Sequence, residues 1–199
     1  AIRLRIREFI NAEVKPVEKI IESEKLDETD RDKYVSHLIE MRKKAFAEGL
    51  WLPHMPKNWG GMGLGHVELA MVQAEAAKSH YGPWVLNCQA PDEGNMHTLL
   101  HWGTEEQLDK YLKPLCEGRT TSCFAMTEPE VAGSDPTLIQ TSGYQDGDEW
   151  VINGHKWFIS NAHRANFAIL VVRTEENPDV PQAANSAFII DLPHAGWTE

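Results

Sequence analysis

One stretch of the chain places several hydrogen-bonding side chains directly after a short apolar run. Residues 121–126 predict a β-strand, and the loop that follows carries Thr127, Glu128, Gly133 and Ser134. Gly133 lacks a Cβ, so backbone N–H groups near it can approach a ligand closely. The hydroxyls of Thr127 and Ser134 can donate hydrogen bonds to a ligand. Two interpretations stay open from these residues alone: a site for a planar cofactor, or an ordinary acidic surface loop.

A second stretch, farther along the chain, has similar chemistry. The pair Asn153–Gly154 lies between two runs of apolar, aromatic and β-branched residues, which predicts a type I′ hairpin. The second predicted strand of this hairpin, residues 155–159, ends at Ser160. Two predicted strands therefore each end in a hydroxyl-bearing side chain, Thr127 and Ser160.

Taken together, the two stretches resemble the acyl-CoA dehydrogenase family, whose members bind FAD. In that family a T-E-P…G-S-D segment and an I-N-G-x-K-x-W-I-[ST]-N-G segment flank the flavin, and residues 127–135 and 152–161 match them here. Further spaced matches in the same order extend the resemblance over roughly residues 1–199, at 94–96, 103–107, 111–115 and Gly118. The resemblance is specific because several separate motifs occur in the right order.

The loop after Pro129 departs from the family's usual T-E-P-G-A-G-S-D. Residues 130–132 stand between Pro129 and Gly133, which makes this loop one residue longer. A subfamily similar to long- and branched-chain acyl-CoA dehydrogenases has a longer loop of this kind. Its members also carry an A-P-D-x-G-N-M segment, which residues 90–96 match. The chain resembles that subfamily.

The resemblance implies a set of site residues on the two segments. Phe158 stands at the position of the family's flavin-facing Trp and Ser160 at that of its Thr, so an apolar face and a hydroxyl are kept. The implied flavin neighbours are Phe124, Met126, Thr127, Phe158, Ile159 and Ser160. Ser134 is implied to contact the substrate or its CoA arm.

The reaction that the resemblance implies is α,β-dehydrogenation of an acyl-CoA thioester in fatty acid metabolism. In the family, a carboxylate of the C-terminal helical domain removes the α proton, and the β hydrogen leaves as a hydride to FAD. Nothing in this chain matches that domain, so we expect a fragment without a catalytic base that is inactive alone. Glu128 is a loop residue in the resemblance and is not assigned as the base.

The resemblance also implies partners, and it leaves alternative functions open. The partners are an acceptor similar to electron-transfer flavoprotein and further copies of the protein, as a homodimer or homotetramer. One alternative is an acyl-CoA oxidase or a related flavin monooxygenase, in which the reduced flavin meets O₂. The other alternative is a non-catalytic interaction module.

The composition limits the kinds of partner. The 30 acidic and 19 basic residues give a formal charge of −11, which speaks against nonspecific nucleic-acid binding. No apolar run approaches the roughly 18 residues that a membrane-spanning helix needs. Cys88, Cys116 and Cys123 have no C-x-x-C spacing and are expected as buried or neutral thiols in a reducing compartment. We expect the cytoplasm for a bacterial protein and the mitochondrial matrix for a eukaryotic one.

The hydrophobic period changes once along the chain. Apolar residues at helical spacing predict helices through residue 118, with Asp30 as an N-cap and Thr104 opening a capping box. Short apolar runs then predict strands at 121–126, 149–152, 155–159, 166–172 and 186–191. The predicted fold is α+β: an all-α N-terminal domain over residues 1–119 and an incomplete antiparallel β domain over 120–199.

Two short patterns suggest metal binding only weakly. His97 and His101 lie four residues apart, as two ligands on one helical face would. No H-E-x-x-H pattern accompanies them in the sequence, so packing or surface histidines are the favoured interpretation, and no metal site is predicted. Residues 146–149 lack the pattern of a calcium loop and predict a polar hairpin turn.

Overall fold

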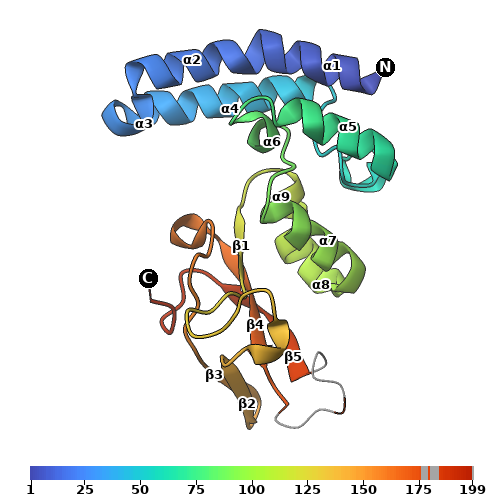
Figure 1. Cartoon of the computed structure of the whole chain (residues 1–199). Helices are drawn as coiled ribbons and strands as arrows, with labels where there is room; N and C mark the ends of the chain where they lie inside the picture. The colour runs from blue at the N-terminus through green and yellow to red at the C-terminus, as the bar shows by residue number, and fades with distance from the viewer. Residues whose placement is uncertain (176–178, 180–183, 199) are drawn as a thin grey trace. The chain divides into compact units, whose positions relative to one another are not determined.

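The computed structural model describes residues 1–175, 179 and 184–198. The chain forms two compact units, Ala1–His97 and Thr98–Glu199. Helix gives way to strand between Cys116 and Ser122, where the hydrophobic period predicts the change. A helical N-terminal part followed by a sheet (Figure 1) confirms the predicted α+β class.

The helices and strands within the described residues are as follows. The helices are α1 (Ile2–Phe9), α2 (Lys15–Glu24), α3 (Leu26–Thr29), α4 (Arg31–Ala47), α5 (His66–Ala76), α6 (Gly82–Val85), α7 (Asp92–Trp102), α8 (Glu105–Gln107) and α9 (Lys113–Cys116). The strands are β1 (Ser122–Ala125), β2 (Ser142–Asp146), β3 (Glu149–Asn153), β4 (Phe167–Arg173) and β5 (Asn185–Asp191).

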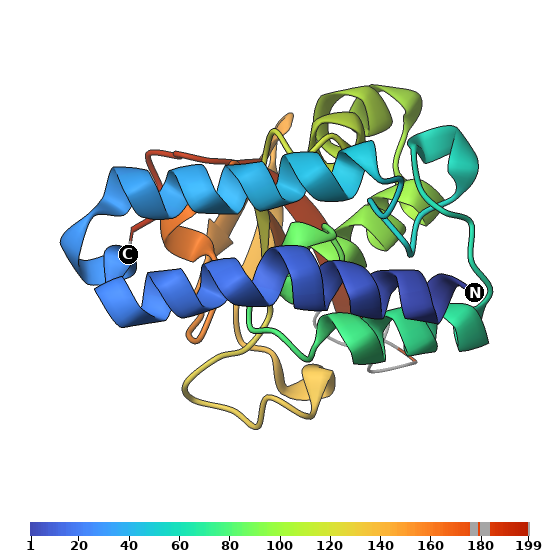
Figure 2. The ribbon, with the colours of Figure 1, turned by 90° about the horizontal axis from the view of Figure 1, so that it is seen from above.

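The first unit is built on a long helix that Pro16 interrupts. A π-helical turn, Ile10–Val14, joins α1 to α2 just before this proline, which has no N–H and would clash with the carbonyl of an ordinary preceding turn. The α1–α2 segment and α4 run side by side in both ribbon views (Figures 1 and 2). Their apolar faces share one buried core, which includes Ile6, Ile10 and Met41.

Capping residues define the helix ends that the sequence predicts. Asp30 begins α4 by accepting a hydrogen bond from the backbone N–H of Lys33 at 3.0 Å. Thr104 begins α8 with a reciprocal capping box, because its hydroxyl and the Gln107 side chain each bond to the other residue's backbone N–H. Both caps satisfy N–H groups that the first turn of a helix leaves unpaired.

The sheet of the second unit is mixed rather than antiparallel, which corrects the antiparallel arrangement predicted. Strand β4 pairs in parallel with β1 and, at Ser142 and Arg173, with β2, while β4–β5 and β2–β3 are antiparallel. The β2–β3 hairpin is inserted between β1 and β4 in the sequence, so β1 and β4 meet through a long connection rather than a tight turn. Strand β4 is almost fully buried, as expected for the centre of a sheet.

The hairpin turn that residues 146–149 predict is present at Asp146–Glu149, where Gly147 has a φ of 63°. The second predicted turn, at Asn153–Gly154, is wrong, because β3 ends at Asn153 without pairing to a following strand there. Gly154 is not in the left-handed region that a type I′ turn requires. Its missing side chain serves packing instead, because a Cβ there would lie 2.2 Å from Oγ1 of Thr141. Residues 155–159, predicted as a strand, form none.

Helical residues of the second unit attach to the end of β5. Lys110 Nζ and the Tyr111 hydroxyl donate to the two carboxylate oxygens of Asp191 at 2.7 and 2.9 Å. The Tyr111 ring also packs on Phe167 at the start of β4, with 5.0 Å between centroids. Among the described residues, no helix combines the length and the hydropathy needed to cross a membrane.

Candidate functional site

The loop after β1 folds back on itself. Thr127 follows the strand as a half-buried residue, and a Cβ built on Gly133 would lie 3.1 Å from its Cγ2. A side chain at position 133 would push against Thr127, so glycine permits the loop to return here. Ser134 lies in the same loop and is exposed, and the Asp135 side chain accepts a hydrogen bond from the Thr137 backbone.

The second predicted segment is an irregular stretch with a strained backbone. Phe158 and Asn161 have left-handed φ values of 53° and 71°. A residue other than glycine costs roughly 1–2 kcal/mol in that conformation, and such strain gathers at ligand-binding sites. The Phe158 side chain is nevertheless 81% exposed, and its ring lies 4.4 Å from that of Trp157. The strained backbone thus presents an aromatic pair to solvent.

The two segments lie against each other. The backbone N–H of Trp157 donates to the carbonyl of Thr127 at 3.0 Å. The ammonium group of Lys156 donates to the carbonyl of Met126 at 2.9 Å. These bonds bring Thr127 beside the residues directly before Phe158, without a strand pairing between the segments.

A buried ion pair fastens this junction. Lys156 Nζ lies 2.8 Å from Glu128 Oε1, and the two side chains are only 8% and 2% exposed. The Glu128 carboxylate also accepts hydrogen bonds from the backbone N–H groups of Gln140 and Thr141. Burial alone would raise the pKa of Glu128, but hydrogen bonds from Lys156, Thr141 and Gln140 outweigh it and lower the pKa to about 2. Glu128 is therefore an ionised structural anchor and not a proton acceptor.

A pocket of about 490 Å³ lies beside this junction within the second unit. Its walls combine aromatic and aliphatic side chains with polar groups, among them Thr141, Phe158, Ile159, His163, Leu170 and Trp197. The volume falls within the range of roughly 300–1,000 Å³ that small-molecule sites occupy. The pocket can hold an apolar ring system with hydrogen-bonding edges.

The predicted site residues divide into three groups. Phe158 and Ile159 line the pocket. The backbone carbonyls of Met126 and Thr127 accept the hydrogen bonds that join the two segments. The remaining predicted residues are exposed side chains outside the pocket wall, namely Phe124, Ser134 and Ser160.

Sequence reasoning missed other residues of the pocket wall. Thr141 precedes a strand that shows almost no hydrophobic alternation, and Trp197 lies far along the chain near its end. The sequence singles out Glu128 as a polar loop residue but does not predict that it pairs with Lys156. The distance of 28 residues between the two carries no periodic signal.

Comparisons with known proteins agree on one family. The model described as "Acyl-CoA dehydrogenase, N-terminal domain" matches residues 1–119, and "Acyl-CoA dehydrogenase, middle domain" matches residues 123–198. Human acyl-CoA dehydrogenase family member 11 is 40% identical over 196 residues. That alignment covers 96% of this chain and 25% of the human protein, so the chain spans a quarter of that relative.

Solved structures give the same result. A Mycobacterium abscessus protein described as an acyl-CoA dehydrogenase is 35% identical with a TM-score of 0.87, over 98% of this chain and 50% of its own. A glutaryl-CoA dehydrogenase from Mycobacterium smegmatis, solved in complex with FADH2, shares the fold at 24% identity with a TM-score of 0.72, over 99% of this chain and 46% of its own. The family models between them cover nearly all of the chain, which therefore belongs to the acyl-CoA dehydrogenase family.

Proposed function

We propose that the protein binds FAD at the junction of residues 124–127 and 156–160 and catalyses α,β-dehydrogenation of an acyl-CoA thioester. One observation carries the proposal. The Trp157–Phe158 pair is exposed on strained backbone beside the pocket, and bonds from residues 156 and 157 hold it against Met126 and Thr127. An exposed aromatic pair at such a position is suited to contact a planar ring.

The residues of the pocket fit an isoalloxazine ring. Trp157 and Phe158 offer aromatic faces, Ile152 and Leu170 offer aliphatic contacts, and all four line the pocket. FAD, when bound, accepts the hydride that leaves the β carbon of the substrate. The chain's own task is to orient the ring and keep water from it, which aromatic and aliphatic walls do by burying apolar surface.

Hydroxyl groups are proposed to fix the edge of the ring. Thr127 is half-buried at the junction, and Ser160 is exposed two residues after Phe158. Each hydroxyl can donate to a ring oxygen or nitrogen. Ser134, exposed in the loop that Gly133 folds back, is proposed to contact the substrate or its CoA arm.

The α proton requires a base that we do not assign to this chain. Glu128 is excluded because its carboxylate is buried, ion-paired and bonded to two backbone N–H groups. We propose that the complete protein supplies the base, passes electrons to an acceptor similar to electron-transfer flavoprotein and assembles into a homodimer or homotetramer. The relatives are much longer than this chain, which covers 25% of the human protein and 50% of the Mycobacterium abscessus protein.

The proposed function is tested by comparing this chain with the complete product of its gene. Acyl-CoA thioesters of several chain lengths are added with an artificial electron acceptor. The complete product is expected to contain FAD, to lose its visible flavin absorption on adding an acyl-CoA, and to reduce the acceptor. The 199-residue chain is expected to show no turnover. Turnover by this chain alone would overturn the assignment of the base, and a flavin that no acyl-CoA bleaches would overturn the reaction.

A further inference from the structure

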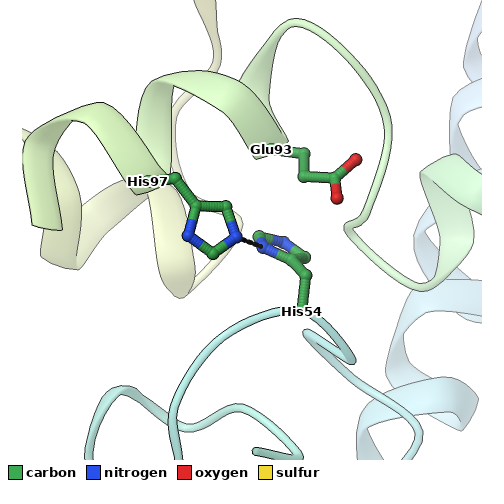
Figure 3. A group of neighbouring side chains, drawn as sticks. All are labelled: His54, Glu93 and His97. Carbon is green, nitrogen blue, oxygen red and sulfur yellow. Dashed lines mark hydrogen bonds between the residues drawn. The ribbon is translucent and has the colours of Figure 1, made fainter. Parts of the chain in front are cut away.

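Three side chains of metal-ligating type meet in the first unit. Glu93 and His97 lie one turn apart on α7, and His54 lies on the loop between α4 and α5 (Figure 3). One ligand atom of each residue lies within 4.8 Å of the others. Sequence spacing suggests His101 as the partner of His97, but the fold brings His97 to His54, which lies 43 residues earlier.

The His54 ring is held in one defined tautomer. Its Nε2 lies 3.1 Å from the carbonyl oxygen of Asn87, which can only accept, so Nε2 carries the proton. The lone pair is therefore on Nδ1, which faces Nε2 of His97 at 3.1 Å (Figure 3). A histidine that donates its second N–H to a backbone carbonyl has the outer contact typical of a metal ligand.

Glu93 is held in a similar way. The side-chain amide of Gln73, on α5, donates to Oε1 of Glu93 at 2.9 Å. Metal-binding carboxylates commonly accept such a hydrogen bond, which fixes the orientation of the group. His54 and Glu93 thus each have an orienting partner, and these partners come from separate parts of the chain.

The distances suit a small transition-metal ion. With metal–nitrogen bonds of about 2.05 Å, nitrogens 3.1 Å apart subtend roughly 100° at the ion, close to a tetrahedral angle. The carboxylate oxygen of Glu93 lies within 4.8 Å of both nitrogens, whereas two ligands of one tetrahedral ion are about 3.3 Å apart, so a movement of at most about 1.5 Å brings Glu93 to the ion.

We propose that His54, Glu93 and His97 form a binding site for a divalent transition-metal ion of the zinc type. The two imidazoles and one carboxylate would supply three ligands, and water would complete the coordination. Such a set favours Zn²⁺ or Co²⁺ over Mg²⁺, which prefers oxygen ligands. The ion would tie the loop after α4 to α7 and so stabilise the first unit. This site is independent of the proposed flavin function.

The test uses the untagged 199-residue chain after treatment with a chelator. Co²⁺ is titrated while its visible absorption is followed, Zn²⁺ is added in competition, and Mg²⁺ serves as the comparison ion. We expect one Co²⁺ per chain with the absorption of a tetrahedral site, displacement by Zn²⁺, no effect of Mg²⁺, and a higher Tm with Zn²⁺. A bound fraction far below one per chain, or an unchanged Tm, would show that the two histidines merely share a hydrogen bond.

Variants assign the ligands. His54→Gln and His97→Gln are each expected to weaken Co²⁺ binding by at least about 100-fold, and Gln73→Ala, which frees Glu93, by roughly 10-fold. His101→Gln, on the same helix, should bind like the unaltered chain. Circular dichroism identifies any variant that fails to fold, and Glu93→Gln then provides a second ligand test with less effect on the core. Equal loss in His101→Gln, or full binding by both His97→Gln and Glu93→Gln, would overturn the proposed site.

Discussion

Removing the ammonium group of Lys156 tests the junction between the two segments. Lys156→Met keeps the length of the side chain but leaves the 2%-exposed carboxylate of Glu128 without its counter-ion. Breaking a buried pair costs about 3–5 kcal/mol, and we expect the lower end, about 3 kcal/mol, because two backbone N–H groups still bond to Glu128. For a chain of this size that corresponds to a Tm lower by roughly 6–12 °C.

A double-mutant cycle separates the ion pair from general damage. In Glu128→Gln/Lys156→Met the buried charge is absent, so the loss should fall short of the sum of the single variants by about 1–3 kcal/mol. Lys43→Met is the matched control: Lys43 also lies 2.8 Å from a carboxylate, that of Glu40, but both side chains are more than half exposed. That substitution should cost less than about 1 kcal/mol.

The measurement combines thermal denaturation with hydrogen exchange at one amide. The Trp157 N–H bonds to the Thr127 carbonyl, so its exchange should accelerate in Lys156→Met and not in Lys43→Met. The pH dependence has a defined sign. Because the pKa of Glu128 is lowered to about 2 in the folded chain, its stabilisation is present above about pH 4.5 and is lost as the pH falls toward about 2. A loss below about 0.5 kcal/mol in Lys156→Met, or additive single variants, would refute a structural role for the pair.

Two further predictions concern the flavin site and the packing of glycines. In the complete gene product, Phe158→Ala should weaken FAD binding more than Ser160→Ala or Thr127→Ala, because a neutral hydrogen bond contributes only about 0.5–1.5 kcal/mol. Flavin fluorescence titrations measure the three affinities, and equal affinities would contradict the prediction. Gly82→Ala should destabilise the chain by about 1–3 kcal/mol, because a Cβ at position 82 would lie 2.0 Å from the Ala76 carbonyl oxygen. Denaturant unfolding measures the loss of stability, and an unchanged midpoint would contradict the prediction.

The parts of the fold that local chemistry specifies could be predicted from the sequence. Asp30 and Thr104 begin helices because their side chains satisfy nearby backbone N–H groups, which depends on only a few neighbouring residues. The strand β4 could also be predicted, because a short continuous run of apolar residues is itself the signal of a buried strand. Strand β2 was missed because only Gly143 of its five residues is buried, which leaves no alternating pattern.

Features set by contacts between distant residues could not be predicted in this way. Asn153–Gly154 has the composition of a hairpin turn, but the packing of Gly154 against Thr141 decides its conformation. The parallel pairing of β1 with β4 depends on where the β2–β3 hairpin, which separates the two strands in the sequence, returns the chain to the sheet. At the candidate site, the family resemblance supplied the residues, whereas the Glu128–Lys156 pair and the left-handed Phe158 appear only in three dimensions.

The central claim, that residues 124–127 and 156–160 contact a flavin, is tested most directly by nuclear magnetic resonance of this 199-residue chain. FAD is titrated into the isotope-labelled protein, and shifts of assigned backbone amides and of the Trp157 indole are followed. We expect saturable shifts concentrated on Thr127, Trp157, Phe158 and Ile159, and weaker ones in Phe158→Ala. Shifts confined to other residues, or none up to millimolar FAD, would contradict the proposed site.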